Sequence, residues 1–338
     1  MSKEKDIIAR IANKLPRCEN QLNKLFESDS EIIKYGSKKL LVTIDEFSTE
    51  DLFRDHDPYI LGWNLAAATI SDILASCGLP EYYGHSVMID NNKWDDHYLG
   101  RFSTGIADVL KKVKAFFIGG DVGSSDHWHY TGVAIGKANK PVTRMGAKPG
   151  DLILMTGQIG AGNLEAALKL YSDKYIFNKV LQKYKIRLAL RVDESKLISQ
   201  YATSCIDSSD GVLNAVNTIS DLNHLGFEIN NTPYLRNGVI ACSILSKPKE
   251  LLLMGECGEY ELVFTIDKKN LAPLLQQSKE QKLFFTQIGY MAEKPLKILA
   301  ARNCHIDFFG FDISARDYSD VNLYLDALTK YIYSHENQ

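Results

Sequence analysis

Five aspartates in this sequence follow or interrupt apolar segments, where a fully solvated charge is not expected. They are Asp45, Asp72, Asp121, Asp207 and Asp210. A single aspartate at the end of a strand usually forms a turn or caps a helix. Five aspartates in such positions are harder to explain in that way, and together they indicate a site that requires carboxylates.

Asp72 is the most informative of the five, because it lies within the segment DPYILGWNLAAATISDILASCG at residues 57–78. Drawn as a helix, this segment is apolar on nearly all sides, and such a helix is largely buried. A buried carboxylate is costly unless it is paired or bound to a cation. Two interpretations remain open: Asp72 binds a cation, or it bonds a neighbouring loop and only holds the structure.

Mg²⁺ is the cation whose chemistry fits these carboxylates, since it takes oxygen ligands and usually bridges them to the phosphates of a substrate. Without such ions, clustered carboxylates would repel a phosphate ester. Glycines at Gly119-Gly120 and in the loop TGQIGAGN at 156–163 would let backbone N–H groups approach an anion closely. The loop at 156–163 can equally be a tight turn, because it matches no standard nucleotide motif.

The elements that must position these residues are predicted to form an α+β fold, because strands and helices mix without strict alternation. In the first half, strands are expected at 38–45, 82–90, 114–120 and 130–138, with helices at 57–78 and near 95–113. We expect the strand at 114–120 to be buried and to end at Gly119-Gly120-Asp121. Further along, strands are expected at 227–230, 260–266, 284–291, 296–300 and 305–309, with helices within 173–202, after Asp210, near 268–280 and at 318–333.

Two domains are expected from the length of 338 residues. The run NKPVTRMGAKPGD at 139–151 collects proline, glycine and basic residues, which is typical of a boundary. The prediction is an N-terminal domain at 1–140, a C-terminal domain at 141–317 and a helical tail at 318–338.

The amino-acid composition argues against some binding partners and some cellular locations. The net charge of −3 gives no basic field for nucleic acid or an anionic membrane, and no apolar run is long enough for a spanning helix. The N-terminal segment lacks the apolar core of a signal peptide. Six cysteines are scattered singly, which fits reduced thiols better than disulfides or a zinc site. We therefore predict a cytoplasmic protein.

The motifs taken together resemble thiamine-monophosphate kinase, within the superfamily of ATP-dependent enzymes typified by aminoimidazole ribonucleotide synthetase. The resemblance covers roughly residues 27–312. It is carried, in chain order, by SKKLLVTID, GWNLAAATISDILASCGLP, IGGD, RMGAKPGDLILMTGQIG, IDSSDGV, EYELVF and the IG at 288–289. It implies a PurM-like architecture: an N-terminal α/β domain that pairs with its twin in a homodimer, a C-terminal α+β domain, and ATP with several Mg²⁺ ions between them.

The resemblance implies a nearly complete set of nucleotide and metal contacts. The implied metal ligands are Asp29, Thr43, Asp45, Asp72, Asp121, Asp207 and Asp210. The implied nucleotide contacts are Gly119, Gly120, Asp121, Arg144 and Ser209. One departure is Ser28, which stands where the family has the first aspartate of a pair.

The acceptor side of the resemblance is altered at three positions. Leu52 stands where the family has a histidine that contacts thiamine phosphate. Gly258 stands where it has a substrate-binding glutamate, so Glu256 or Glu259 would have to reach that space. Phe311 stands where it has a tryptophan that contacts thiamine. This pattern predicts retained ATP chemistry with a changed acceptor.

The leading hypothesis is an ATP- and Mg²⁺-dependent phosphotransferase that acts on a small phosphorylated acceptor, with thiamine monophosphate as the default. Positioning and electrostatics would supply the rate, so no side chain is assigned as a nucleophile. Two alternatives stay open. One is a related ATP-using enzyme with a different acceptor. The other is a non-catalytic nucleotide-binding relative, which the missing first aspartate and the missing histidine favour and the six retained carboxylates oppose.

Overall fold

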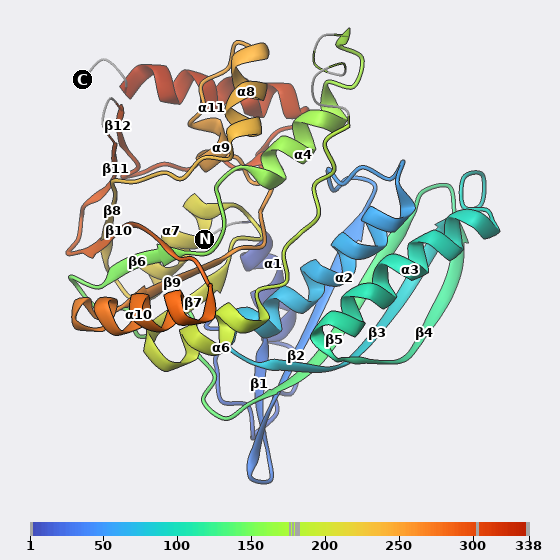
Figure 1. The fold of residues 1–338 in the computed structure, drawn as a ribbon, viewed down its shortest axis with the longest axis horizontal. Helices are drawn as coiled ribbons and strands as arrows, with labels where there is room; N and C mark the ends of the chain where they lie inside the picture. Colours follow the sequence, from blue (N-terminus) through green and yellow to red (C-terminus); the bar gives the residue numbers. More distant parts are fainter. Residues whose placement is uncertain (1–2, 176, 178, 180–182, 302–303, 336–338) are drawn as a thin grey trace.

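A computed structural model describes residues 3–175, 177, 179, 183–301 and 304–335 (Figure 1). It contains two sheets, and each is built from one continuous part of the chain. Helices and strands are mixed in both parts, so the predicted α+β class is confirmed. In the part of the chain that the structure describes, no helix is both long and apolar enough to cross a lipid bilayer.

The first sheet has the strand order β1-β2-β5-β3-β4. Its strands are β1 (Glu31–Tyr35), β2 (Lys38–Ser48), β3 (Leu79–Asp90), β4 (Phe116–Ser125) and β5 (His129–Ala138). β3 and β4 are parallel, and the other neighbours are antiparallel. Helices α2 (Pro58–Ala75) and α3 (Asp96–Val113) cover one face of this sheet, as Figure 1 shows.

Helix α2 forms as its sequence predicts. The Asp57 side chain accepts a hydrogen bond from the backbone N–H of Ile60, and Pro58 occupies the first helical position, where its missing N–H costs nothing. Most of the residues that follow are buried, because they face the sheet, α3 and the second half of the chain. A buried helix is therefore the support for Asp72.

The second sheet has the order β12-β11-β8-β10-β6-β9-β7. Its strands are β6 (Leu152–Met155), β7 (Ala202–Asp207), β8 (Gly226–Ile229), β9 (Leu262–Ile266), β10 (Thr286–Ala292), β11 (Lys297–Ala301) and β12 (Cys304–Asp307). The helices around it are α4 (Ala161–Leu170), α6 (Val192–Tyr201), α7 (Val212–Leu222), α8 (Arg236–Ile244), α9 (Leu251–Met254), α10 (Leu271–Gln281) and α11 (Val321–His335). The short helix α1 (Lys3–Ala12) precedes the first sheet.

The prediction of a buried strand at 114–120 is wrong in two respects. Strand β4 continues through Gly119-Gly120-Asp121 to Ser125, so this motif lies within the strand and not at its end. β4 is also the edge strand of its sheet, and Phe116, Phe117 and Ile118 are more than half exposed. Apolar composition suggested burial, but within the described residues β4 pairs with β3 alone and most of its side chains are exposed.

Several elements were not predicted. β1, α8 and α9 are short and lack a strong periodic pattern. Of the helical stretches expected within 173–202, α6 is present, while residues 184–191 are extended. Residues 176, 178 and 180–182 lie outside the described part of the chain.

Candidate functional site

Three aspartates from separate elements meet where the two sheets approach each other. Asp29 precedes β1, Asp72 lies on α2, and Asp207 is the last residue of β7. One carboxylate oxygen from each lies within 4.8 Å of the others. Within the described residues, the second oxygens of Asp29 and Asp207 are buried without a hydrogen-bond partner. Buried, unpartnered carboxylate oxygens fit a hard cation such as Mg²⁺.

Neighbouring side chains fix these aspartates in place. The Thr43 hydroxyl, on β2, donates a hydrogen bond to the Asp72 carboxylate. The Arg144 guanidinium donates to Oδ1 of Asp29 at 2.8 Å, and the Asp29 side chain is 1% exposed. Ser209 donates its backbone N–H to Oδ1 of Asp207 at 3.3 Å. The predicted contacts Thr43, Arg144 and Ser209 therefore lie directly beside the aspartate cluster.

Burial and mutual repulsion raise the pKa of three aspartates in and beside the cluster, Asp45, Asp72 and Asp207. Burial, followed by the charges of Asp207, Asp29 and Asp210, raises the pKa of Asp45 to about 8. Burial and then the charge of Asp29 raise the pKa of Asp207 to about 6. Burial and then the charge of Asp45 also raise the pKa of Asp72 well above its usual range. A bound cation would reverse this repulsion, so the cluster is suited to cation binding with release of protons.

A pocket of about 290 Å³ lies beside the aspartate cluster, and Asp72 belongs to its wall. Asp45, Asp72, Ser209, Asp210 and Glu256 line it. Leu52 and Gly258, two of the three positions where the acceptor contacts differ from the family pattern, also lie in its wall. We call this pocket the inner compartment.

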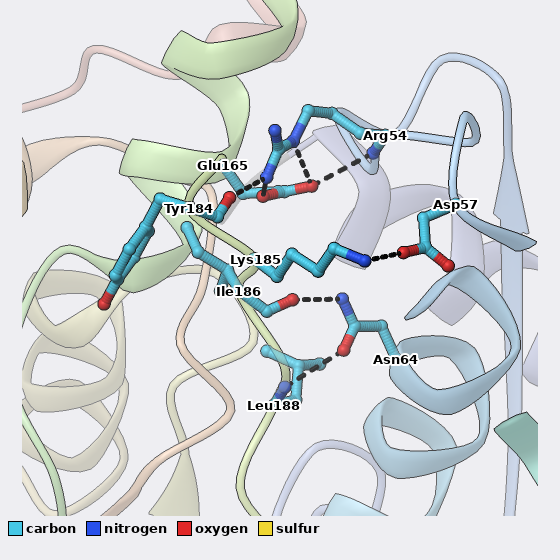
Figure 2. A network of polar contacts seen from close by, with 8 residues as sticks. All are labelled: Arg54, Asp57, Asn64, Glu165, Tyr184, Lys185, Ile186 and Leu188. Atoms are coloured by element: carbon cyan, nitrogen blue, oxygen red, sulfur yellow. Dashed lines mark hydrogen bonds and ion pairs between the residues drawn. The ribbon is translucent and has the colours of Figure 1, made fainter. Parts of the chain in front are cut away.

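An extended segment at residues 184–191 forms one wall of the inner compartment (Figure 2). Arg54 pairs with Glu165 on α4 through two hydrogen bonds of 2.7 and 2.8 Å and also donates to the carbonyl of Tyr184. The Asn64 amide, on α2, donates to the carbonyl of Ile186 and accepts from the N–H of Leu188. These bonds hold the segment against the N-terminal half of α2, about two turns before Asp72.

A second, larger pocket of about 640 Å³ adjoins the inner compartment. We call it the outer compartment. Its walls come from α4, α8, α9, α11 and the loop after β2. The residues common to both compartments are Glu46, Phe47, Asp51, Leu52, Asp210, Glu256, Cys257 and Arg316.

The glycine loop at 156–163 is filled by carboxylates of the protein itself. Gly157 has φ +62°, and a Cβ atom there would overlap the Glu261 carboxylate. Arg191 holds Glu261 through two hydrogen bonds of 2.6 Å, and the N–H of Gly160 donates to Glu259. In this structure the loop is a tight turn around two glutamates, which favours that interpretation over an anion cradle.

The three residues proposed for the acceptor lie in different surroundings. Glu256 lines both compartments, and its carboxylate accepts a hydrogen bond from the N–H of Ala315 at 2.8 Å. Glu259 is buried under the glycine loop, and burial raises its pKa to about 8. The ring of Phe311 contacts Phe308 and Tyr331 edge-on, and Phe311 is absent from the walls of both compartments. Only Glu256 is therefore placed to meet a molecule in the compartments of a single chain.

Gly119, Gly120 and Asp121 lie apart from the aspartate cluster in the single chain. They belong to β4, and β3 and β5 separate β4 from β2. Strands in a sheet are spaced by about 4.8 Å, so β4 is about 14 Å from β2, which carries Asp45. Their predicted role in nucleotide and metal binding stays a prediction.

Some residues of the site were not predicted from the sequence. Asn64, Glu165 and Arg316 line the inner compartment, and Tyr324 lines the outer one. None of them belongs to a motif with recognisable spacing. Only Asn64 offered a local indication, because it is a polar residue within an apolar helix.

Comparison with known proteins gives consistent results. Residues 27–138 match the N-terminal domain of the AIR synthase related protein family. The chain is 31% identical over 272 residues to thiamine-monophosphate kinase of Pyrococcus horikoshii, covering 80% of this chain and 84% of that protein. It is 28% identical over 267 residues to thiamine-monophosphate kinase of Aquifex aeolicus, covering 76% and 85%. The fold matches the structure of AaThiL complexed with AMPPCP and TMP with a TM-score of 0.73 at 24% identity, covering 87% of this chain and 91% of that one.

Proposed function

The chain belongs to the thiamine-monophosphate kinase family of ATP-dependent kinases, and from that premise we propose that it transfers a phosphoryl group from Mg·ATP to a small phosphorylated acceptor. The observation that carries the proposal is the cluster of Asp29, Asp72 and Asp207, of which Asp72 lines the inner compartment. AaThiL is described with AMPPCP, an ATP analogue, and TMP bound, which supports a site for both a nucleotide and a phosphorylated acceptor.

The proposed metal ligands are Asp29, Thr43, Asp45, Asp72, Asp121, Asp207 and Asp210. Mg²⁺, when bound, would neutralise charge on the transferred phosphoryl group and hold it in line with the acceptor. Arg144 and Ser209 lie beside these carboxylates and would contact the nucleotide phosphates. The carboxylate set remains nearly complete despite Ser28, whose hydroxyl lies 3.1 Å from the hydroxyl of Ser76.

The proposed reaction needs no side-chain nucleophile or base. An oxygen of the acceptor phosphate forms the new bond to the γ-phosphorus. The bond from that phosphorus to the β–γ bridging oxygen breaks, and ADP leaves with the electron pair. A phosphate ester has a second pKa of about 6, so its oxygen is already ionised at neutral pH. The work of the protein is to position two anions for the transfer and to stabilise the charge that develops.

Thiamine monophosphate is the default acceptor in this proposal. The changes at Leu52 and Gly258 argue for a different or weaker recognition of it, since both residues line the inner compartment. Each lost polar contact typically costs about 1–3 kcal/mol. We therefore propose that the ATP half of the site is retained and that the acceptor half differs.

We further propose that the protein acts as a homodimer through the first sheet. The first sheet exposes the apolar side chains Ile44 on β2, Tyr82 on β3 and Phe116, Ile118 and Val122 on β4. An exposed apolar face beside an unpaired edge strand is typical of a surface that packs against another protein chain. A partner subunit packed here would also bring Gly119-Gly120-Asp121 towards a nucleotide from outside the single chain.

The cellular location proposed is the cytoplasm. Among the described residues, no disulfide joins any of Cys18, Cys77, Cys205, Cys242, Cys257 and Cys304. Cysteines outside disulfides suit a reducing compartment.

The test is a pair of measurements on the purified protein. ATP with Mg²⁺ should raise the melting temperature, because a ligand at a hundredfold excess over its Kd stabilises the folded state by about 2.7 kcal/mol. ATP with EDTA should give little shift, because the phosphates would face unshielded carboxylates. ADP release should then depend on an acceptor from a panel that includes thiamine monophosphate. Absence of any ATP-dependent shift, with or without metal, would contradict the proposal and favour a non-catalytic relative.

A further inference from the structure

Three buried serine hydroxyls meet beside the aspartate cluster, and two of them belong to the residues that flank Asp29. Ser28 directly precedes Asp29, Ser30 directly follows it, and Ser76 lies at the end of α2. The Ser76 hydroxyl is 2.6 Å from that of Ser30 and 3.1 Å from that of Ser28, and the backbone N–H of Ser30 donates to it at 3.2 Å. A single side chain therefore contacts both neighbours of a proposed metal ligand.

The direction of these bonds follows from the capacity of a hydroxyl group, which accepts two hydrogen bonds and donates one. Ser30 donates to the Ser76 oxygen through its hydroxyl and through its N–H, and these two bonds fill the acceptor positions. The proton of Ser76 is then directed to the Ser28 hydroxyl. The hydroxyl of Ser76 thus uses its whole hydrogen-bonding capacity on the two residues that flank Asp29.

Ser76 belongs to the same rigid element as Asp72. It caps the C-terminal end of α2, and its N–H donates to the carbonyl of Asp72 at 3.0 Å. Residues four apart in a helix lie on the same face, about 6 Å apart along the axis. The serine contacts therefore fix the backbone around Asp29 to the turn of α2 that follows Asp72.

The other polar contacts of this segment come from Arg144 and do not involve α2. The Arg144 guanidinium donates to Oδ1 of Asp29 and to the carbonyl of Phe26, and the Arg144 N–H donates to the carbonyl of Glu27. Among the hydrogen bonds of the described residues, those to Ser76 are the ones that tie residues 28–30 to α2. Removal of the Ser76 hydroxyl should therefore leave Asp29 paired with Arg144 but no longer held at a fixed distance from Asp72.

We propose that Ser76 is a positioning residue, whose hydroxyl sets the distance between the Asp29 and Asp72 carboxylates and thereby favours Mg²⁺ over larger divalent cations. The inference rests on the proposed function, in which these carboxylates are metal ligands. Mg²⁺ requires near-ideal octahedral geometry, whereas Ca²⁺ accepts six to eight oxygen ligands in flexible arrangements. A less firmly held Asp29 should therefore cost Mg²⁺ more affinity than Ca²⁺.

The first experiment measures binding of AMPPCP to the full chain by calorimetry at a series of free Mg²⁺ concentrations and, separately, of free Ca²⁺ concentrations. The readout is the metal concentration that gives half-maximal binding. Ser76→Ala should raise this concentration about tenfold for Mg²⁺, as is usual when a residue that orients a metal ligand is removed, and at most about threefold for Ca²⁺. An equal change for both ions, or no change, would overturn the proposal.

Ser195→Ala is the matched control for the loss of a buried hydroxyl at this end of α2. Ser195 is also buried, and its hydroxyl donates to the carbonyl of Leu74 at 2.7 Å, whereas no hydrogen bond of the described residues joins it to residues 28–30. This variant should lower the melting temperature but leave both half-maximal metal concentrations within about twofold of the wild type. If it changed the Mg²⁺ dependence as much as Ser76→Ala does, the effect would come from lost stability, and the inference would be wrong.

Ser30→Ala is a milder variant that tests the same contact if Ser76→Ala does not fold. It removes the 2.6 Å bond and keeps both the Ser76 hydroxyl and the backbone donor of residue 30. The half-maximal Mg²⁺ concentration should rise about three- to tenfold, as expected for one hydrogen bond. Adding Ser30→Ala to Ser76→Ala should have little further effect, because the two hydroxyls act through a shared bond. Fully additive effects would count against the inference.

The wild type separates failure of this inference from failure of the proposed function. AMPPCP binding that does not depend on a divalent cation, or no AMPPCP binding at all, would contradict the proposed function and this inference with it. Metal-dependent AMPPCP binding in the wild type, with the same Mg²⁺ requirement in Ser76→Ala and Ser30→Ala, would contradict this inference alone.

Discussion

Asp72 on α2 and Asp207 at the end of β7 hold carboxylate oxygens within 4.8 Å of each other, although α2 packs on the first sheet and β7 belongs to the second. Two carboxylates at this distance repel each other unless a proton or a cation lies between them. Their proximity therefore makes the junction of the two sheets the centre of the proposed chemistry.

Replacing Asp72 with asparagine should separate a metal ligand from a structural residue. Asp72→Asn keeps the shape of the side chain and removes one charge from the cluster, so ADP release with Mg·ATP should fall at least about a hundredfold, or about 2.7 kcal/mol in barrier height. The melting temperature without metal should be unchanged or higher. Asp96→Asn, at an exposed position in the first turn of α3, serves as the control. Near-normal activity combined with a lower melting temperature would show that Asp72 is structural.

Glu259 should make the stability of the protein depend on pH. Its pKa is about 8 in the fold because of burial, against 4.5 for an ordinary glutamate. Between these values the folded state binds more protons than the unfolded chain, so the contribution of Glu259 to stability is lost as pH rises from about 5 to 8. Glu259→Gln remains neutral and can still accept the hydrogen bond of Gly160.

Urea denaturation at pH 5, 6.5 and 8 tests this expectation. The free energy of unfolding of the variant should increase relative to that of the wild type as pH rises. Asp45 and Asp207 also have raised pKa values, but both proteins contain them, so their contributions cancel in the difference. Glu280→Gln, at an exposed site on α10, should show no such trend. A difference between wild type and Glu259→Gln that is independent of pH would contradict a raised pKa at Glu259.

Gly157 should tolerate substitution less well than another glycine with the same backbone conformation. Gly36 has φ +61° with open space around its Cα, whereas a Cβ at Gly157 would overlap the carboxylate of Glu261. Gly36→Ala should cost about 1–2 kcal/mol, the usual penalty for a left-handed residue. Gly157→Ala should cost at least about 2 kcal/mol more, because Arg191 prevents Glu261 from moving away. If urea denaturation gave equal losses of unfolding free energy for the two variants, the Glu261 side chain would be able to move aside at no cost.

Strand β4 should be required for dimer formation. Phe116→Lys places a charge on the exposed edge strand and should convert a dimer to a monomer in light scattering at micromolar concentration. Phe284→Lys is the matched control, since Phe284 is also highly exposed but lies near the second sheet. A monomeric wild-type protein, or a dimer that survives Phe116→Lys, would count against this interface.

Much of the local structure could be predicted because its causes are local. Asp57 and Pro58 set the start of α2, and the apolar sequence after them makes it a buried helix around Asp72. Runs of apolar residues, some alternating with polar ones, predicted the bounds of β2, β3 and β5 to within three residues. The aspartate at the end of β7 followed from the sequence, because strand ends and polar turns are encoded by neighbouring residues, whereas β2 continues three residues past Asp45 to Ser48.

Tertiary structure alone decided which of these residues meet. Asp29, Asp72 and Asp207 lie far apart in the chain, and only the packing of the two halves of the chain, with α2 against β7, brings their oxygens together. The same packing leaves β4 exposed, fills the glycine loop with Glu259 and Glu261, and places Tyr324 in the wall of a chamber. Composition and periodicity report how one segment prefers to fold. They carry no information on which side chains a distant segment will place beside it, and this is why the carboxylates could be identified from the sequence but the acceptor site could not.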